Sequence, residues 1–157
     1  MDNSMKVGLS FGLTSAVITT LGLMVGLNAG THSKLIVIGG IITIAIADAF
    51  SDSLGIHISE EAQGKSAKQI WTSTISTWVA KFVFAMTFLI PVLLLELQTA
   101  IYVSIIWGLL LLGVYSYYLA KQEKIAPYRV IGEHLGIAII VILITNFIGE
   151  WVNANLI

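Results

Sequence analysis

Five stretches of this chain, each roughly 20 residues long and almost free of charge, restrict it to few folds. That length of apolar sequence is what an α-helix needs to cross the hydrocarbon core of a membrane. The stretches cover residues 7–28, 35–57, 73–97, 100–120 and 130–152. Strands of a membrane barrel would alternate polar and apolar side chains, and residues 139–144 do not. The prediction is an all-α membrane protein, a bundle of five transmembrane helices forming a single domain over residues 1–157.

The composition agrees with a surface that faces lipid. Hydrophobic residues make up 57% of the chain and charged residues 11%, whereas a soluble domain carries about 25% charged residues. The lipid bilayer is therefore the expected partner. The net charge of -1 gives no basis for nucleic-acid binding, and the lack of cysteine excludes disulfides and thiolate metal sites.

The basic residues predict the orientation. Lysine and arginine are enriched in cytoplasmic loops. On the N-terminal side of a five-span topology lie Lys6, Lys65, Lys68, Lys121, Lys124 and Arg129, and on the other side only Lys34. We therefore expect a cytoplasmic N-terminus, an external C-terminus and a place in the cell membrane. The longest connection is predicted at residues 59–72, and the others are short turns between antiparallel neighbours.

Two acids interrupt the second span. Asp48 and Asp52 are four residues apart and so share one helix face. Counted from His57 at 1.5 Å per residue, Asp48 lies roughly 13 Å deep, close to the midplane. Ionisable residues at that depth are costly and are a functional-site hypothesis by default. Two carboxylates one turn apart repel each other unless a cation or a proton lies between them.

Two explanations of these acids remain open. Lys81, in the third span, is expected at a depth close to that of Asp52 and could form a structural ion pair with it. That pair would neutralise only one of the two acids. A proton relay or a cation site at Asp48 and Asp52 is the alternative.

Further ionisable residues lie near the expected cytoplasmic boundary. Glu133 and His134 begin the fifth span, and with His57, Glu60 and Glu61 they could line an entrance funnel. Ordinary interfacial residues are the competing interpretation, because an acid is also favoured near a helix N-terminus. Carboxylates bind hard divalent ions, and histidine suits iron, manganese or zinc. The candidate metal ligands are Asp48, Asp52, His57, Glu60, Glu133 and His134.

The first span carries small residues at a four-residue spacing, at Gly8, Gly12 and Ala16 and again at Gly22 and Gly26. Small residues allow membrane helices to approach closely, so this helix is predicted to be central, in the bundle or at a dimer seam. The same span carries the hydroxyl groups of Thr14, Ser15, Thr19 and Thr20. We expect these hydroxyl groups to donate hydrogen bonds to backbone carbonyls. Pro91 is predicted to kink the third span near Thr87.

Several motifs resemble the vacuolar iron transporter family. Residues 8–14 (GLSFGLT) are similar to its opening Gly-Leu-Ser/Asn-Asp-Gly-Leu signature, and Ser51, Gly55 and Ser59 match its helix-two pattern. Residues 89–91 (LIP), 111–113 (LLG) and 145–149 (TNFIG) resemble later segments in the same order. The resemblance implies five helices, export of ferrous iron or manganese from the cytoplasm in exchange for protons, and a homodimer. The ion path would follow helices one and two of both subunits.

The departures from that family concern its acidic and thioether positions. Phe11 replaces the helix-one acid, Asp52 replaces a methionine, Ile56 replaces a glutamate, and Asp48 occupies a usually small position. The long cytoplasmic metal-binding insert is missing. Exchanging a thioether for a carboxylate makes the site harder and shifts the expected selectivity from iron towards manganese.

The functional hypothesis is a proton-coupled transporter that exports Fe²⁺ or Mn²⁺, with the metal as cargo and no tightly bound cofactor. The alternative is a non-transporting membrane scaffold or assembly subunit in which Asp48, Asp52 and Lys81 form an ionic lock. An enzyme is not expected, because the chain has no HExxH or GxSxG motif.

Overall fold

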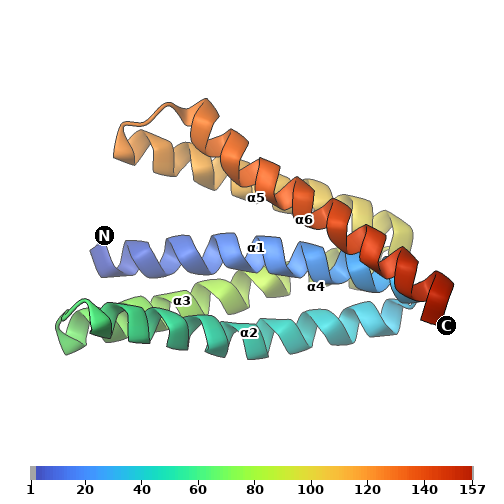
Figure 1. Cartoon of the computed structure of the whole chain (residues 1–157), viewed down its shortest axis with the longest axis horizontal. Helices are drawn as coiled ribbons and strands as arrows, with labels where there is room; N and C mark the ends of the chain where they lie inside the picture. The colour runs from blue at the N-terminus through green and yellow to red at the C-terminus, as the bar shows by residue number, and fades with distance from the viewer. Residues whose placement is uncertain (1–2, 157) are drawn as a thin grey trace.

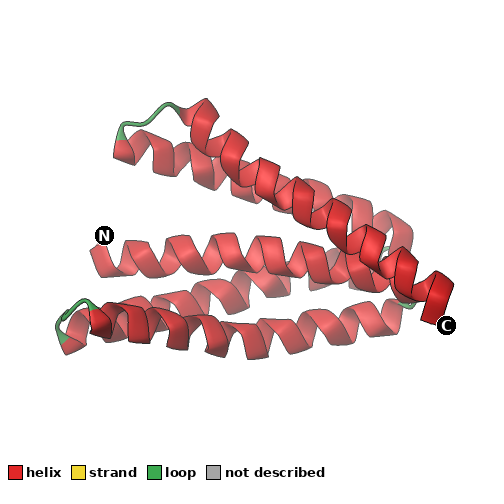
Figure 2. Cartoon of the chain, in the orientation of Figure 1, coloured by secondary structure: helices red, strands yellow, loops and turns green. Residues whose placement is uncertain are grey.

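The structure is a computed structural model that describes residues 3–156. It is a helical bundle, and no strand occurs within this range (Figures 1 and 2). The helices are α1 (Asn3–Thr31), α2 (Lys34–Ala62), α3 (Ala67–Thr87), α4 (Leu89–Leu94), α5 (Leu97–Glu123) and α6 (Pro127–Leu156). Taking α3 and α4 together, five helical segments in the described range are long and apolar enough to cross a membrane.

The helices extend beyond the apolar stretches at most of their ends. The predicted long connection at residues 59–72 is mostly helical, because α2 continues to Ala62 and α3 begins at Ala67. Ser66 caps α3 through a reciprocal capping box with Gln69, which satisfies amide groups that a helix start leaves unpaired. Polar residues at this end of the bundle therefore continue the helices instead of forming a loop.

The third span bends where a proline was expected to bend it. Phe88 separates α3 from α4, and Pro91 follows in the first turn of α4. A proline ring clashes with the carbonyl four residues earlier, here that of Thr87. At the end of α4, the Lys34 ammonium donates to the carbonyl of Leu95 at 2.8 Å. The basic residue at this end of the bundle thus satisfies a carbonyl that the end of α4 leaves free.

Helix α1 is the centre of the bundle. It packs on α2, α3, α5 and α6 and lies between the α2–α3 and α5–α6 hairpins (Figure 1). A Cβ atom built at Gly8 would overlap Ser76 of α3, and one at Gly12 would lie 2.7 Å from the carbonyl oxygen of Thr77. Further along, Gly26 packs on Thr145 of α6. The small residues of α1 therefore serve contacts within this chain.

The outer faces of the other helices are apolar and exposed. Large exposed side chains include Phe50 and Leu54 of α2, Ile75 and Val79 of α3, Leu110 and Val114 of α5, and Leu143 and Phe147 of α6. A soluble monomer rarely exposes so continuous an apolar surface. This surface is compatible with contact to lipid.

Candidate functional site

Lys81 is the largest fully buried side chain among the described residues, with 1% of its surface exposed. Its ammonium lies 2.5 Å from Oδ2 of Asp48 and forms a second ion pair with Oδ2 of Asp52. One lysine of α3 thus faces two acids on consecutive turns of α2. The ion pair between Lys81 and Asp52 that the sequence suggested is present, and Lys81 pairs with Asp48 as well, because its flexible stem places the ammonium between both carboxylates.

Helix α1 contributes Ser15 to the same centre. The Ser15 hydroxyl donates to Oδ2 of Asp52 at 2.7 Å, and its oxygen lies 2.5 Å from the Lys81 ammonium. We call Ser15, Asp48, Asp52 and Lys81 the charge centre. It joins α1, α2 and α3, and it lies halfway along the bundle because Asp48 is the middle residue of α2 (Lys34–Ala62).

The role of Ser15 was missed in the sequence. The expectation that its hydroxyl bonds to a backbone carbonyl is wrong, although it holds for Thr14 and Thr19, which donate to carbonyls one turn earlier at 2.8 Å. Thr20 has no hydrogen-bond partner among the described residues. Which hydroxyl turns towards α2 depends on the rotation of α1 about its axis, and residue spacing alone does not determine that rotation.

The two acids differ in their surroundings. Asp52 accepts hydrogen bonds from both Ser15 and Lys81. Oδ2 of Asp48 lies within ion-pair distance of Lys81 but makes no aligned hydrogen bond within the described chain. The Asp48 side chain is 26% exposed and that of Asp52 19%. Asp48 is therefore the less firmly held and more accessible carboxylate.

A surface groove of about 620 Å³ between α1 and α2 leads to Asp48. Its walls include Leu23 and Leu27 of α1, and Gly40 and Ser51 of α2. Most of these residues lie between Asp48 and the α1–α2 turn. On the other side of the charge centre, towards the N-terminus of α1, Gly8 and Gly12 pack closely on α3. Access to the carboxylates is thus wider from the side of the α1–α2 turn.

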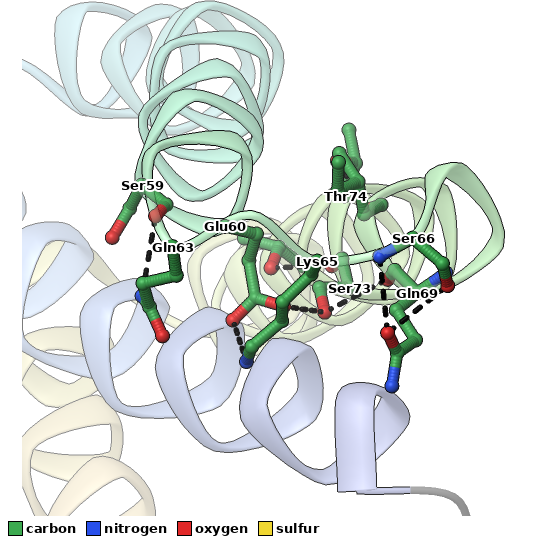
Figure 3. A network of polar contacts seen from close by, with 10 residues as sticks. Ser59, Glu60, Gln63, Lys65, Ser66, Gln69, Ser73 and Thr74 are labelled. Carbon is green, nitrogen blue, oxygen red and sulfur yellow. Dashed lines mark hydrogen bonds and ion pairs between the residues drawn. The ribbon is translucent and has the colours of Figure 1, made fainter.

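Glu60 forms a second polar cluster at the α2–α3 turn (Figure 3). It is 3% exposed, and its carboxylate pairs with Lys65 at 2.8 Å and accepts a hydrogen bond from Ser73 at 3.2 Å. Each carboxylate oxygen thus has its own partner. The cluster joins the end of α2 to the beginning of α3 and has the form of a structural ion pair.

The remaining candidate ligands lie apart from the charge centre. Nδ1 of His57 is 3.0 Å from the Thr74 hydroxyl, and Nδ1 of His134 is 2.8 Å from that of Ser116. Glu133 is exposed at the beginning of α6. Within residues 3–156, no group of three or more histidine, aspartate or glutamate side chains is arranged to hold a metal ion. The six predicted ligands thus divide among the bundle centre, the α2–α3 turn and the beginning of α6.

Comparisons with known proteins do not add a relative. No protein-family model, no curated protein and no solved structure matched the chain. Its function has to be inferred from the chemistry of its own side chains.

Proposed function

We propose that the protein is a proton-coupled membrane transporter that exports a divalent metal ion, Fe²⁺ or Mn²⁺, and that the charge centre is where protons and metal exchange. The observation that carries the proposal is the position of Lys81 between Asp48 and Asp52, in the middle of a bundle with five segments long and apolar enough to cross a membrane. Charged groups at membrane depth are expensive and typically belong to ion or proton pathways.

The charges of this centre do not balance by themselves. With both acids ionised and the lysine protonated, Asp48, Asp52 and Lys81 sum to one negative charge. A buried site of low polarity favours a neutral state. In the proposed cycle, the metal-free centre reaches neutrality by binding one proton at the acids besides the proton on Lys81, so two protons are available for exchange.

A divalent ion offers a second neutral state. Two ionised carboxylates balance its charge if Lys81 releases its proton and withdraws. Passage between the two states exchanges two protons for one divalent ion without net charge movement. Carboxylate oxygens suit Mn²⁺ better than soft ligands would. The resemblance to vacuolar iron transporters supports the same cargo and the outward direction.

The distribution of basic residues between the two ends of the bundle supports the proposed orientation. The N-terminus, the α2–α3 turn and the α5–α6 turn lie at one end, and the α1–α2 and α4–α5 turns at the other (Figure 1). The first end carries most of the basic residues outside the spans and is assigned to the cytoplasm. The groove beside Asp48 would then open towards the outside. As the resemblance implies, two copies would pair along α1 and α2.

The second candidate is a non-transporting membrane scaffold with a closed ionic lock. It is favoured by the burial of Lys81, which is 1% exposed and touches both acids. Breaking such a pair by removing one partner is strongly destabilising.

Flux in proteoliposomes separates the two candidates. The purified protein is given gradients of Mn²⁺ and then Fe²⁺, with a pH dye inside the vesicles. We expect metal uptake coupled to proton movement, unaffected by an imposed membrane potential. Asp48→Asn should abolish flux and preserve folding, because Asp52 and Ser15 still hold Lys81. Glu150→Gln, an acid at the far end of α6, is the matched control. A folded wild-type protein without flux of either ion would favour the scaffold.

A further inference from the structure

A cavity of about 810 Å³ lies between α1, α5 and α6, separate from the groove at Asp48. It occupies the end of the bundle where the α5–α6 hairpin diverges from α1 (Figure 1). None of the four charge-centre residues lines it. The cavity thus has no part in the exchange proposed above and requires its own explanation.

The lining changes from polar to apolar along the bundle. Lys6, Gln122 and Glu123 lie at the rim, where α1 begins and α5 ends. Leu13 and Ile18 line the deeper part. From Lys6 to Ile18 the helix rises roughly 18 Å, and one leaflet contributes about 15 Å of hydrocarbon. The cavity therefore has the polarity gradient and the depth of one lipid leaflet.

The polar groups below the rim are already engaged. The hydroxyls of Ser10 and Tyr115 hydrogen bond each other between α1 and α5, and Ser116 bonds His134. These pairs leave the deeper wall without a free charge in the described range. A hydrocarbon chain suits such a wall, whereas a hydrated ion does not.

The rim carries two charges of opposite sign. Neither Lys6 nor Glu123 forms an ion pair with another residue of the range 3–156. A lysine ammonium binds phosphate as a point charge, and a carboxylate accepts hydrogen bonds from a primary amine. Both residues line the same cavity, and their charges complement those of a head group that contains both a phosphate and an amine.

We propose that this cavity binds one aminophospholipid of the cytoplasmic leaflet. Its phosphate lies at Lys6, its amine at Glu123, and an acyl chain follows α1 towards Ile18. The proposal rests on the membrane residence and orientation proposed above, but not on transport. A lipid bound here fills the space between α1 and the α5–α6 hairpin.

Native mass spectrometry of the detergent-purified protein tests this site. Phosphatidylethanolamine, phosphatidylglycerol and phosphatidylcholine are added separately, and retained lipid is counted per protein. We expect one tightly retained phosphatidylethanolamine. Lys6→Gln should lower retention of all three lipids by about fivefold, the effect of one basic residue near a lipid surface. Glu123→Gln should lower retention of phosphatidylethanolamine alone. Lys68→Gln, on α3 at the same end, is the control and should change nothing.

A second variant separates loss of the site from loss of the fold. Ile137 lines the cavity but is 51% exposed, so Ile137→Trp fills space without disturbing the bundle core. It should abolish retention at an unchanged unfolding temperature. Equal retention by the wild type, Lys6→Gln and Ile137→Trp would mean that the lipid binds elsewhere on the protein surface, and it would overturn the proposal. Retention of detergent but of no lipid would overturn it as well. Lipid retention by a wild-type protein that carries neither Mn²⁺ nor Fe²⁺ would support this site while contradicting the transport proposal.

Discussion

The Ser15 hydroxyl of α1 donates a hydrogen bond of 2.7 Å to the Asp52 carboxylate of α2, in the middle of the bundle. The same oxygen lies 2.5 Å from the Lys81 ammonium. The central helix is therefore bonded to both signs of charge in the centre. Moving α1 along or about its axis would break these bonds, and this couples the position of the helix to the state of the charges.

Removing this hydroxyl should loosen the charge centre. Ser15→Ala leaves Asp52 with one hydrogen bond fewer in a largely buried place, and we expect a loss of about 1–3 kcal/mol in the free energy of unfolding. Denaturation in detergent micelles, followed by circular dichroism, measures it. Thr14→Ala is the matched control, because Thr14 donates only within its own helix. Equal losses in both variants would contradict the assigned role of Ser15.

Lys81 should be the most sensitive position for stability. Lys81→Met leaves two facing carboxylates uncompensated and is expected to cost about 3–5 kcal/mol. The double variant Lys81→Met/Asp52→Asn removes both charges of one ion pair and should recover part of the lost free energy of unfolding. A double-mutant cycle gives the coupling energy between the two side chains. Additive losses would show that the two residues do not interact.

The contact between α1 and α3 should tolerate no side chain at Gly8. A Cβ atom there would overlap Ser76 and the carbonyl oxygen of Ser73, so Gly8→Ala forces the helices apart at a cost of about 1–3 kcal/mol. At Gly132 a Cβ atom meets nothing within 4 Å. Gly132→Ala is therefore expected to be neutral or slightly stabilising through helix propensity. Thermal unfolding of the two variants compares them directly.

Lys34 should stabilise the end of the bundle that holds the α1–α2 and α4–α5 turns. Its ammonium donates to the Leu95 carbonyl at 2.8 Å and to that of Leu93 at 3.4 Å. Lys34→Met should cost about 0.5–1.5 kcal/mol, the net value of one hydrogen bond, and should speed amide exchange in α4. Lys68→Met, whose side chain forms no ion pair in the described range, provides the comparison. Unchanged exchange in α4 would contradict the capping role.

The apolar runs were enough to predict five long helical segments, because a run of roughly 20 apolar residues favours a helix long enough to cross a membrane. They were not enough to predict the helix ends. Residues 59–72 looked like a loop since they are polar, but a capping box at Ser66 and an ion pair at Glu60 continue the helices. Ser66 and Gln69 have the spacing of a capping box, which marks the start of a helix at Ala67 and so a shorter connection.

The charge centre could be predicted in part. Asp48, Asp52 and Lys81 were recognisable because charges are rare at membrane depth. The double contact of Lys81 and the contribution of Ser15 depend on how three helices are rotated, and contacts such as Gly12 against Thr77 determine that rotation. The dispersal of the six predicted metal ligands has the same origin: spacing along one helix says nothing about the distance to another.

The glycines of α1 make close contacts with two different parts of the bundle. Gly8 and Gly12 fasten α1 to the α2–α3 hairpin, while Gly26 and Gly30 meet α6 near Gly149, at the other end of α1. The α5–α6 hairpin thus packs closely on α1 at that end and diverges from α1 at the other, where the Ser10–Tyr115 hydrogen bond still joins α1 to α5 (Figure 1). A change in the angle of the hairpin about the Gly149 contact would alter the cavity and the Ser10–Tyr115 hydrogen bond more than the Lys81 contacts.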